Sequence, residues 1–260
     1  MNKEKCTIYS VYHKPSVQPD ADFIIPIHAG KAISKITLPF AGDDTGENIS
    51  ALNQSFCELT VVYWIWKNVQ FNPGDVWGLC HYRRYFIMPK QGLFAKKKST
   101  IQKELTVESL NETVNNKLLH YIEKKLKDAD AIVQYPAYVR SKNGDIVTIE
   151  ANYAEYHIAR HWEITKEVIL ELYPAYEESL EAFCKSTKMS FLNMMIANAT
   201  LWNEYLNWMF NILFEIEKRI EIPEDVYQTR VFGFISERLL NLYLIYNKIR
   251  IAYMPIGFYE

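Results

Sequence analysis

Short apolar runs alternate along the chain with longer segments in which apolar residues recur every three or four positions. A short apolar run is typical of a buried strand, and the longer period is that of an amphipathic helix. Strands are therefore predicted at 6–12, 23–27, 76–80, 131–135, 192–197 and 250–254, and helices at 51–68, 111–127, 153–172, 175–185, 201–219 and 230–246. This alternation predicts an α/β fold: one domain with a mainly parallel central sheet flanked by helices.

Three connecting segments are polar. Residues 42–50 end at Ser50, which can cap the helix predicted from residue 51. Residues 138–148 surround an Asn-Gly turn dipeptide. Residues 87–110 are predicted to form a loop, and their lysines are Lys90, Lys96, Lys97, Lys98 and Lys103. A lysine-rich loop is usually solvated; the alternative is contact with anionic lipid headgroups.

Composition narrows the class of protein. The 260 residues are 49% hydrophobic, enough for one large domain or two small ones. The net charge of −2 gives no support to a nucleic-acid partner. The four cysteines are scattered without a Cys-x-x-Cys pair, so neither a zinc ribbon nor a redox motif is indicated. No signal-peptide pattern or membrane-length apolar stretch occurs, and we expect a cytoplasmic protein.

Residues 78–86 are the most informative segment, because an apolar run ends there in His81, Tyr82, Arg83 and Arg84. An arginine guanidinium matches two phosphate oxygens and stays charged at any relevant pH. Two arginines at the mouth of an α/β sheet therefore favour a diphosphate or another strong anion as ligand. The alternative is a surface strand whose arginines pair with Asp or Glu elsewhere.

Carboxylate pairs that hold a metal ion would offer another route to phosphate binding. Asp-x-Asp occurs at 20–22 and at 128–130, but both pairs precede their apolar runs. Ligands of α/β sheets bind at the carboxyl ends of strands, so both pairs are predicted to be solvated turns. Asp43 and Asp44 are better acidic candidates, because flanking glycines let the backbone approach a ligand closely.

Other catalytic patterns are weaker. His157 and His161 have the i,i+4 spacing of zinc enzymes, but no Glu follows the first His and no third ligand is evident. The chain has no Gly-x-Ser-x-Gly turn and no glycine-rich phosphate loop. Glu237 could serve as a general base; the alternative is that it complements a helix dipole while Arg238 pairs across the surface. Glu58 and Lys67 are expected to be partners in the site or an internal ion pair.

Several segments together resemble the DUF 4422 family of bacterial capsular and exopolysaccharide glycosyltransferases, which includes galactofuranosyltransferases. The matching segments are 43–53, 56–68, 78–86, 191–197 and 233–240. The resemblance implies a GT-A-like glycosyltransferase domain over 1–260, with a nucleotide-sugar half at about 1–135 and an acceptor half at about 136–260. One departure is His161, which stands where the family pattern leads us to expect an acidic residue.

The resemblance also implies roles for particular residues. The predicted catalytic residues are Glu237 and, second, Asp44. The predicted donor-binding residues are His13, Asp43, Asn48, Asn53, His81, Tyr82, Arg83 and Arg84. The predicted acceptor-binding residues are Asn193, His157 and Arg238. No metal ligand is assigned and no cofactor is firmly implied, although Mn²⁺ or Mg²⁺ would suit such chemistry.

The function implied is transfer of a sugar, with galactofuranose as one candidate, from a UDP-sugar to a growing surface polysaccharide. The acceptor would be an oligosaccharide or lipid-linked saccharide, the reaction inverting, and the enzyme cytoplasmic with peripheral contact to the inner membrane face. One alternative is a non-catalytic protein that binds nucleotide sugars or serves polysaccharide assembly. Another is a metal-dependent phosphoesterase that uses Asp43, Asp44, His81 and His157.

Overall fold

A computed structural model describes residues 5–72, 74–89 and 98–260. Nine described strands form one sheet: β1 (Cys6–Tyr12), β2 (Ile24–His28), β3 (Val76–His81), β4 (Arg84–Phe86), β5 (Thr100–Lys103), β6 (Ala131–Gln134), β9 (Met195–Asn198), β10 (Ile251–Met254) and β11 (Ile256–Tyr259). A two-stranded sheet pairs β7 (Ala137–Tyr138) with β8 (Lys188–Met189). The predicted α/β class is confirmed.

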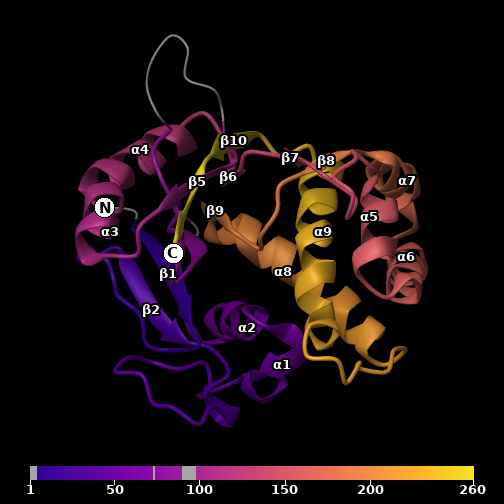
Figure 1. The fold of residues 1–260 in the computed structure, drawn as a ribbon, viewed down its shortest axis with the longest axis horizontal. Helices are drawn as coiled ribbons and strands as arrows, with labels where there is room; N and C mark the ends of the chain where they lie inside the picture. Colours follow the sequence, from indigo (N-terminus) through magenta and orange to yellow (C-terminus); the bar gives the residue numbers. More distant parts are fainter. Residues whose placement is uncertain (1–4, 73, 90–97) are drawn as a thin grey trace.

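The described helices are α1 (Asn53–Phe56), α2 (Leu59–Asn68), α3 (Val107–Thr113), α4 (Asn116–Leu126), α5 (Ile149–Tyr156), α6 (Ala159–Leu172), α7 (Glu177–Lys185), α8 (Ala199–Glu217) and α9 (Val231–Tyr246). Short 3-10 turns lie at η1 (Lys31–Ile33), η2 (Ser50–Leu52), η3 (Pro174–Tyr176) and η4 (Gln228–Arg230). Helices α3 and α4 lie at one end of the molecule in Figure 1, and α5 to α9 lie toward the other. No described helix has the length and apolar character that a membrane crossing requires.

The main sheet is mixed. Strand β1 is parallel to β2 and β3, β6 is parallel to β10, and β5 is parallel to β11. Strand β9 is antiparallel to both β3 and β6, and β4 is antiparallel to both β3 and β11. Parallel strands β1 and β3 therefore end at the same edge, and β9 begins near that edge because it runs the opposite way. This arrangement positions the site described below.

The two faces of the sheet are covered by different helices. Successive residues of a strand point to opposite faces. Leu79 packs in the larger core with α2, α5, α6, α7, α8 and α9, whereas its neighbour Cys80 packs in the smaller core with α3 and α4. In the same way, Ala131 packs in the larger core and its neighbour Ile132 packs in the smaller core. Burial on both faces explains why these strands read as continuous apolar runs.

Several predicted boundaries are corrected. The helix predicted at 51–68 is interrupted at Cys57, where φ is 52°, so that α1 and α2 are separate. The helix predicted at 153–172 is interrupted at His157, whose backbone is extended. The loop predicted at 87–110 contains β5 and the start of α3, and the prediction omitted β4 and β11. These strands are three or four residues long and pair with one another across the chain, a signal too short for sequence periodicity to detect.

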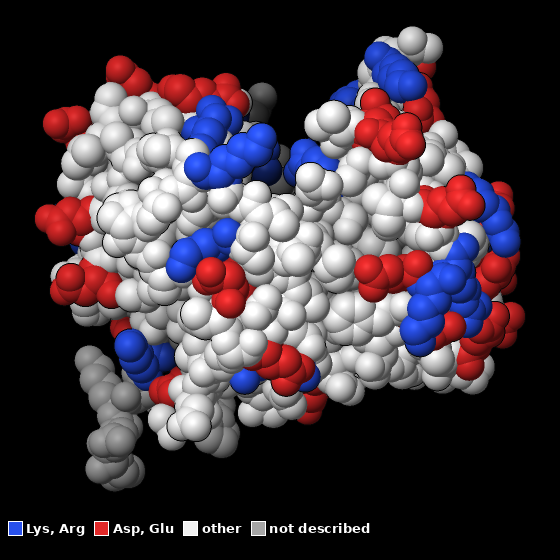
Figure 2. Space-filling model, turned by 90° about the horizontal axis from the view of Figure 1, so that it is seen from below, with Lys and Arg blue, Asp and Glu red and all other residues white. Residues whose placement is uncertain are grey.

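Charge is distributed unevenly over the surface. On the face shown in Figure 2, acidic and basic side chains are intermixed at the right, the side on which Figure 1 shows α5 to α7. The salt bridges of Arg160 with Glu163 and Glu167 lie in this part of the chain. Elsewhere on the same face, Lys and Arg side chains flank a hollow in the surface. The surface is thus not uniformly basic, consistent with the small net charge.

Candidate functional site

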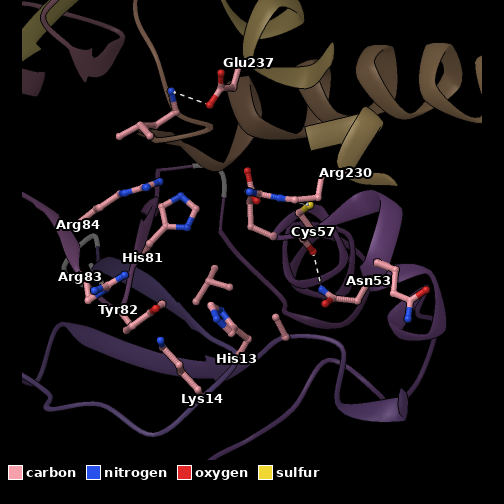
Figure 3. Close-up of a pocket in the computed structure, with 15 residues that line it drawn as sticks. His13, Lys14, Asn53, Cys57, His81, Tyr82, Arg83, Arg84, Arg230 and Glu237 are labelled. Atoms are coloured by element: carbon pink, nitrogen blue, oxygen red, sulfur yellow. Dashed lines mark hydrogen bonds between the residues drawn. The ribbon is translucent and has the colours of Figure 1, made fainter. Parts of the chain in front are cut away.

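A cavity of about 570 Å³ lies at the carboxyl ends of β1 and β3. These strands are parallel neighbours, with Val11 opposite His81, so the residues that follow them meet at one edge of the sheet. His13 and Lys14 follow β1 and line the cavity together with the turn that follows β3. Figure 3 shows the two groups on the same side of the cavity. This edge is where α/β sheets bind their ligands.

The hairpin of β3 and β4 supplies one wall of the cavity. Its turn consists of Tyr82 and Arg83, and His81 pairs with Arg84 across it. Paired residues of neighbouring strands project to the same face, so His81 and Arg84 lie side by side. All four residues line the cavity. One tight turn therefore presents two guanidinium groups and an imidazole to the same space.

Four cationic side chains line the cavity: Lys14, Arg83, Arg84 and Arg230. Within the part of the chain that the structure describes, none of the four forms an ion pair with a carboxylate. Arg83 and Arg84 therefore do not pair with acidic residues of the described chain, which was the alternative prediction. Unpaired positive charges that share one cavity repel one another, and an anion bound among them would relieve that repulsion.

Aromatic rings support all four of these cations, and the Phe234 ring centroid lies 5.5 Å from the Arg230 Cζ. The Tyr82 ring centroid lies 5.8 Å from the Lys14 Nζ and 5.3 Å from the Arg83 Cζ. The Phe258 ring lies 5.0 Å from the Arg84 Cζ. A cation attracted to a ring face keeps N–H donors for another partner. The cations are thus partly held in place while still able to bind a ligand.

His81 carries a buried ring nitrogen. Its Nε2 atom has no hydrogen-bond partner among the described residues. Burial lowers the pKa of His81 to about 4, and the nearby charges of Arg84 and Arg230 act in the same direction against the opposing effect of Glu58. The imidazole is therefore neutral at pH 7. A buried polar atom without a partner is costly, and this residue lines a cavity in which a ligand could supply one.

Two carboxylates, Glu58 and Glu237, line the same cavity. The segment that precedes β9 holds both of them. The Leu192 N–H donates to Glu237 Oε1 at 3.2 Å, and Asn193 Nδ2 donates to Glu58 Oε1 at 2.6 Å and to the Gly233 carbonyl at 3.2 Å. Burial raises the pKa of Glu237 against the opposing charge of Arg238, and the charge of Glu58 acts in the same direction as burial. A carboxylate with a raised pKa is a better proton acceptor near neutral pH.

Backbone strain concentrates around these groups. The described non-glycine residues with positive φ are Cys57 at 52°, Leu192 at 70° and Lys248 at 52°. The first two line the cavity. Cys57 has ψ of −130°, well outside the ordinary left-handed region, and its Sγ accepts a hydrogen bond from Arg230 Nε at 3.4 Å. Conformations of this kind each cost about 1–3 kcal/mol and tend to occur at functional sites.

The family model described as "Domain of unknown function (DUF4422)" matches residues 7–248. The chain belongs to the DUF4422 family. Its fold is similar to a solved structure titled as the apo structure of WbbM, a bifunctional glycosyltransferase, with a TM-score of 0.88 and 27% sequence identity. The match covers 99% of this chain and 46% of that one, so the chain spans about half the length of WbbM. No curated protein matches the sequence.

These matches confirm the predicted family and the predicted GT-A-like α/β fold. The DUF4422 fold brings together many of the residues singled out from the sequence. The predicted site residues that line the cavity are His13, Asn53, His81, Tyr82, Arg83, Arg84 and Glu237. Sequence reasoning did not identify Lys14, Gln54, Cys57, Leu192 and Arg230, which also line it. The position of Lys14 directly after a predicted strand was the one available signal, whereas the others depend on tertiary packing.

Three predicted residues of the loop before α1 lie outside the set that lines the cavity. Asp43 is fully buried and accepts hydrogen bonds from the backbone and from two hydroxyl groups. Asp44 pairs with Lys31 at 3.3 Å. The Asn48 side chain bonds the backbone of its own turn, at Gly46 and Ser50. The geometry gives these residues local structural contacts.

The predicted acceptor residues also make contacts within the DUF4422 fold. Asn193 is buried and holds Glu58, as described above. His157 stacks on Phe234 with ring centroids 4.0 Å apart. Arg238 is buried, donates to the Phe234 carbonyl and to Asn152 Oδ1, and lies over the Tyr153 ring. Glu58 and Lys67 do not form the internal ion pair that was one of two expectations, because Lys67 pairs with Glu47 at 3.6 Å, whereas Glu58 lines the cavity.

The described His, Cys, Asp and Glu side chains do not form a binding site for a divalent metal ion. Among residues 5–72, 74–89 and 98–260, no three His, Cys, Asp or Glu side chains gather in a way that could hold an ion. The Asp-x-Asp pairs lie in surface turns, as predicted, and Asp130 pairs with Arg250 at 2.6 Å. His157 and Asp43 do not line the cavity that contains His81. The arrangement that a metal-dependent phosphoesterase would need is thus not assembled in the described residues.

Proposed function

We propose that the protein is a glycosyltransferase and that its cavity binds the diphosphate of a nucleotide sugar. The observation that carries this proposal is that four cations, none paired with a carboxylate in the described part of the chain, converge on a cavity whose wall also holds two carboxylates. The similarity to WbbM over nearly the whole chain supports the same reaction class. Cations suit the leaving diphosphate, and a carboxylate suits the attacking hydroxyl.

The diphosphate would lie between the β3–β4 hairpin and Arg230. Negative charge builds on the leaving diphosphate as its bond to the sugar breaks. Lys14, Arg83 and Arg84 on one side, and Arg230 on the other, would stabilise that charge from fixed positions in a partly water-excluded site. His81 would donate or accept a hydrogen bond through Nε2. Because the described carboxylates do not form a metal site, we propose that these four cationic side chains stabilise the charge on the leaving diphosphate.

The proton of the acceptor hydroxyl requires a base. In the proposed inverting reaction, the acceptor oxygen bonds to the anomeric carbon, the bond to the diphosphate oxygen breaks, and a carboxylate takes the hydroxyl proton. We assign this role to Glu237, whose pKa is raised by burial. Glu58 is the second candidate in place of Asp44, because Glu58 lines the cavity and Asp44 pairs with Lys31.

The two halves of the chain would divide the substrates. The first half provides the hairpin and β1 side of the cavity, and the second half provides Leu192, Arg230 and Glu237. We therefore propose that the donor binds mainly to residues of 1–135 and that the acceptor approaches from 136–260. UDP as the nucleotide, galactofuranose as the sugar, and a lipid-linked acceptor at the inner membrane face follow from the family resemblance and stay predictions. Lys90, Lys96 and Lys97 of the lysine-rich segment lie outside the described residues.

The proposal is tested by nucleotide binding and turnover together. UDP-, GDP- and dTDP-sugars are titrated calorimetrically, and sugar release or transfer is followed by mass spectrometry. We expect a selective nucleotide sugar to bind, and the double variant Arg83→Ala/Arg84→Ala to bind it at least tenfold more weakly, since each charge-assisted hydrogen bond contributes about 1.5–3 kcal/mol. Arg160→Ala, which removes an exposed arginine distant in the fold, is the matched control.

Each outcome has a clear meaning. Binding with turnover that depends on the two arginines supports a transferase. Binding without turnover on any acceptor points to the non-catalytic alternative. An affinity that the double variant leaves unchanged would refute the assignment of the diphosphate to this cavity.

A further inference from the structure

An exposed aromatic platform adjoins the cavity. It consists of Tyr227, Phe234 and His157. The Phe234 ring stacks on His157 at 4.0 Å and lies 5.0 Å from Tyr227, and the rings of His157 and Tyr227 are nearly parallel at 5.8 Å. The Tyr227 side of the platform faces water, because 49% of that residue is exposed. An exposed ring held by two others is rigid and keeps a face available for a partner.

Arg230 connects the platform to the cavity. It lies one turn before Phe234, and its Cζ sits 5.5 Å from the Phe234 ring centroid while the same residue lines the cavity. Figure 3 shows Arg230 extending into the cavity opposite the hairpin cations. Asp225 accepts hydrogen bonds from the backbone N–H groups of Tyr227 and Gln228, so the segment that carries Tyr227 is held in place. A molecule could thus touch the platform and the reaction centre at once.

The surroundings of the platform favour a sugar over a membrane. The preceding loop, 221–226, contains three acidic residues, Glu221, Glu224 and Asp225, all exposed. Negative charge repels the anionic lipid surface that attracts peripheral proteins. Carboxylates accept hydrogen bonds from hydroxyl groups, and the flat face of an aromatic ring matches the C–H face of a pyranose. The apolar Val226, which is 87% exposed, adds accessible apolar surface beside the platform.

We propose that Tyr227 stacks against a hexopyranose ring of the acceptor, and that this platform is the acceptor-binding subsite next to the reaction centre. The inference rests on the proposed function. His157 then acts as a support that holds the rings in place rather than as a group that contacts the reacting atoms. The Arg230 guanidinium lies between this subsite and the diphosphate site.

The test uses methyl galacto-, gluco- and mannopyranosides as probes, each added to the full chain with saturating UDP and followed by saturation-transfer NMR. Tyr227→Ala removes the exposed ring, and Tyr227→Phe keeps it. Tyr138→Ala is the matched control, since Tyr138 is similarly exposed, at 46%, but lies on β7 and does not belong to the cluster of Tyr227, Phe234 and His157. We expect at least one glycoside to bind through its C–H face, with affinity lowered about fivefold in Tyr227→Ala and retained in Tyr227→Phe and Tyr138→Ala.

Three results would overturn the inference. They are wild-type affinity for the glycoside in Tyr227→Ala, no glycoside binding to the UDP-bound protein, or a loss in Tyr227→Ala of sedimentation with phosphatidylglycerol vesicles. UDP affinity is measured in parallel. If UDP binds normally, any of these results refutes the acceptor-subsite inference alone. If the wild-type protein binds no nucleotide, the proposed function itself is refuted.

Discussion

Asp43 offers a sharp test of whether a residue near the site stabilises the fold or binds the donor. The sequence made it a donor-site candidate, and the structure buries it completely. Its two oxygens accept four hydrogen bonds: from the N–H groups of Gly30 and Lys31 at 2.8 and 3.0 Å, and from the hydroxyls of Ser50 and Thr60 at 2.5 and 2.6 Å. These bonds tie the turn after β2 to η2 and to α2. We predict that Asp43→Ala destabilises the fold.

The magnitude follows from which donors can find new partners. The Thr60 hydroxyl can donate to the Cys57 carbonyl, at 3.1 Å, and the Ser50 hydroxyl can rotate. The two backbone N–H groups have no such freedom, and each loses a hydrogen bond to a charged acceptor that is worth about 1.5–3 kcal/mol. The expected loss is about 4 kcal/mol, which lowers the Tm of a domain this size by about 8–16 °C. Asp43→Asn restores little of this, because its amide NH₂ would face donors.

The assay combines calorimetric Tm, urea unfolding and UDP affinity at a temperature where the variant is folded. Asp44→Ala is the matched control: Asp44 forms one partly exposed ion pair with Lys31, so the loss of that pair costs at most about 1 kcal/mol. We expect a large fall in stability for Asp43→Ala, a small one for Asp44→Ala, and nucleotide affinity within about threefold of wild type for both. An Asp43→Ala protein of normal stability that no longer binds UDP would refute the reasoning and return Asp43 to the donor site.

Three further predictions concern chemistry and pH. Glu237→Gln should lower kcat of sugar transfer about 100-fold or more with UDP affinity retained, as expected for loss of a general base; steady-state kinetics that show near wild-type turnover would shift the role to Glu58. Transfer should persist in EDTA, since the cavity provides cations rather than a metal site; abolition by EDTA and recovery with Mn²⁺ would contradict this. Burial, assisted by Arg238, lowers the pKa of His157 to about 4. The unfolded chain therefore binds more protons between about pH 6.5 and 4, and stability falls as the pH drops through that range. His157→Phe should keep the stack and reduce that loss in urea titrations, whereas an unchanged pH dependence would exclude His157 as a contributor.

Local patterns in the sequence were sufficient for the main elements and for part of the site. Buried strands such as 6–12 and 76–80 appear as apolar runs because both faces of the sheet are covered, and amphipathic helices appear through their period. The arginines of residues 78–86 stood out because they end such a run. Arg83, Arg84 and His81 line one cavity in the structure, and their role in donor binding stays a prediction.

What the sequence could not place depends on contacts between distant segments. Asp43 has the same chemical character whether it faces a ligand or four internal donors, and only the approach of Gly30, Ser50 and Thr60 decides between them. Arg230 lines the cavity beside Cys57, to whose Sγ its Nε donates, and no local pattern predicts a contact between residues so far apart in the chain.

Periodicity and residue type thus determined the α/β class, the order of the main elements and the presence of a cationic strand end, since these follow from interactions between near neighbours in the chain. Tertiary structure alone decided that Glu58 and Glu237 share a wall with four cations that have no carboxylate partner among the described residues. Residues 192–193, on a segment far from both carboxylates in sequence, hold the two groups. Hydrogen bonds over such separations depend on how strands and helices pack, and a short segment of sequence does not determine that packing.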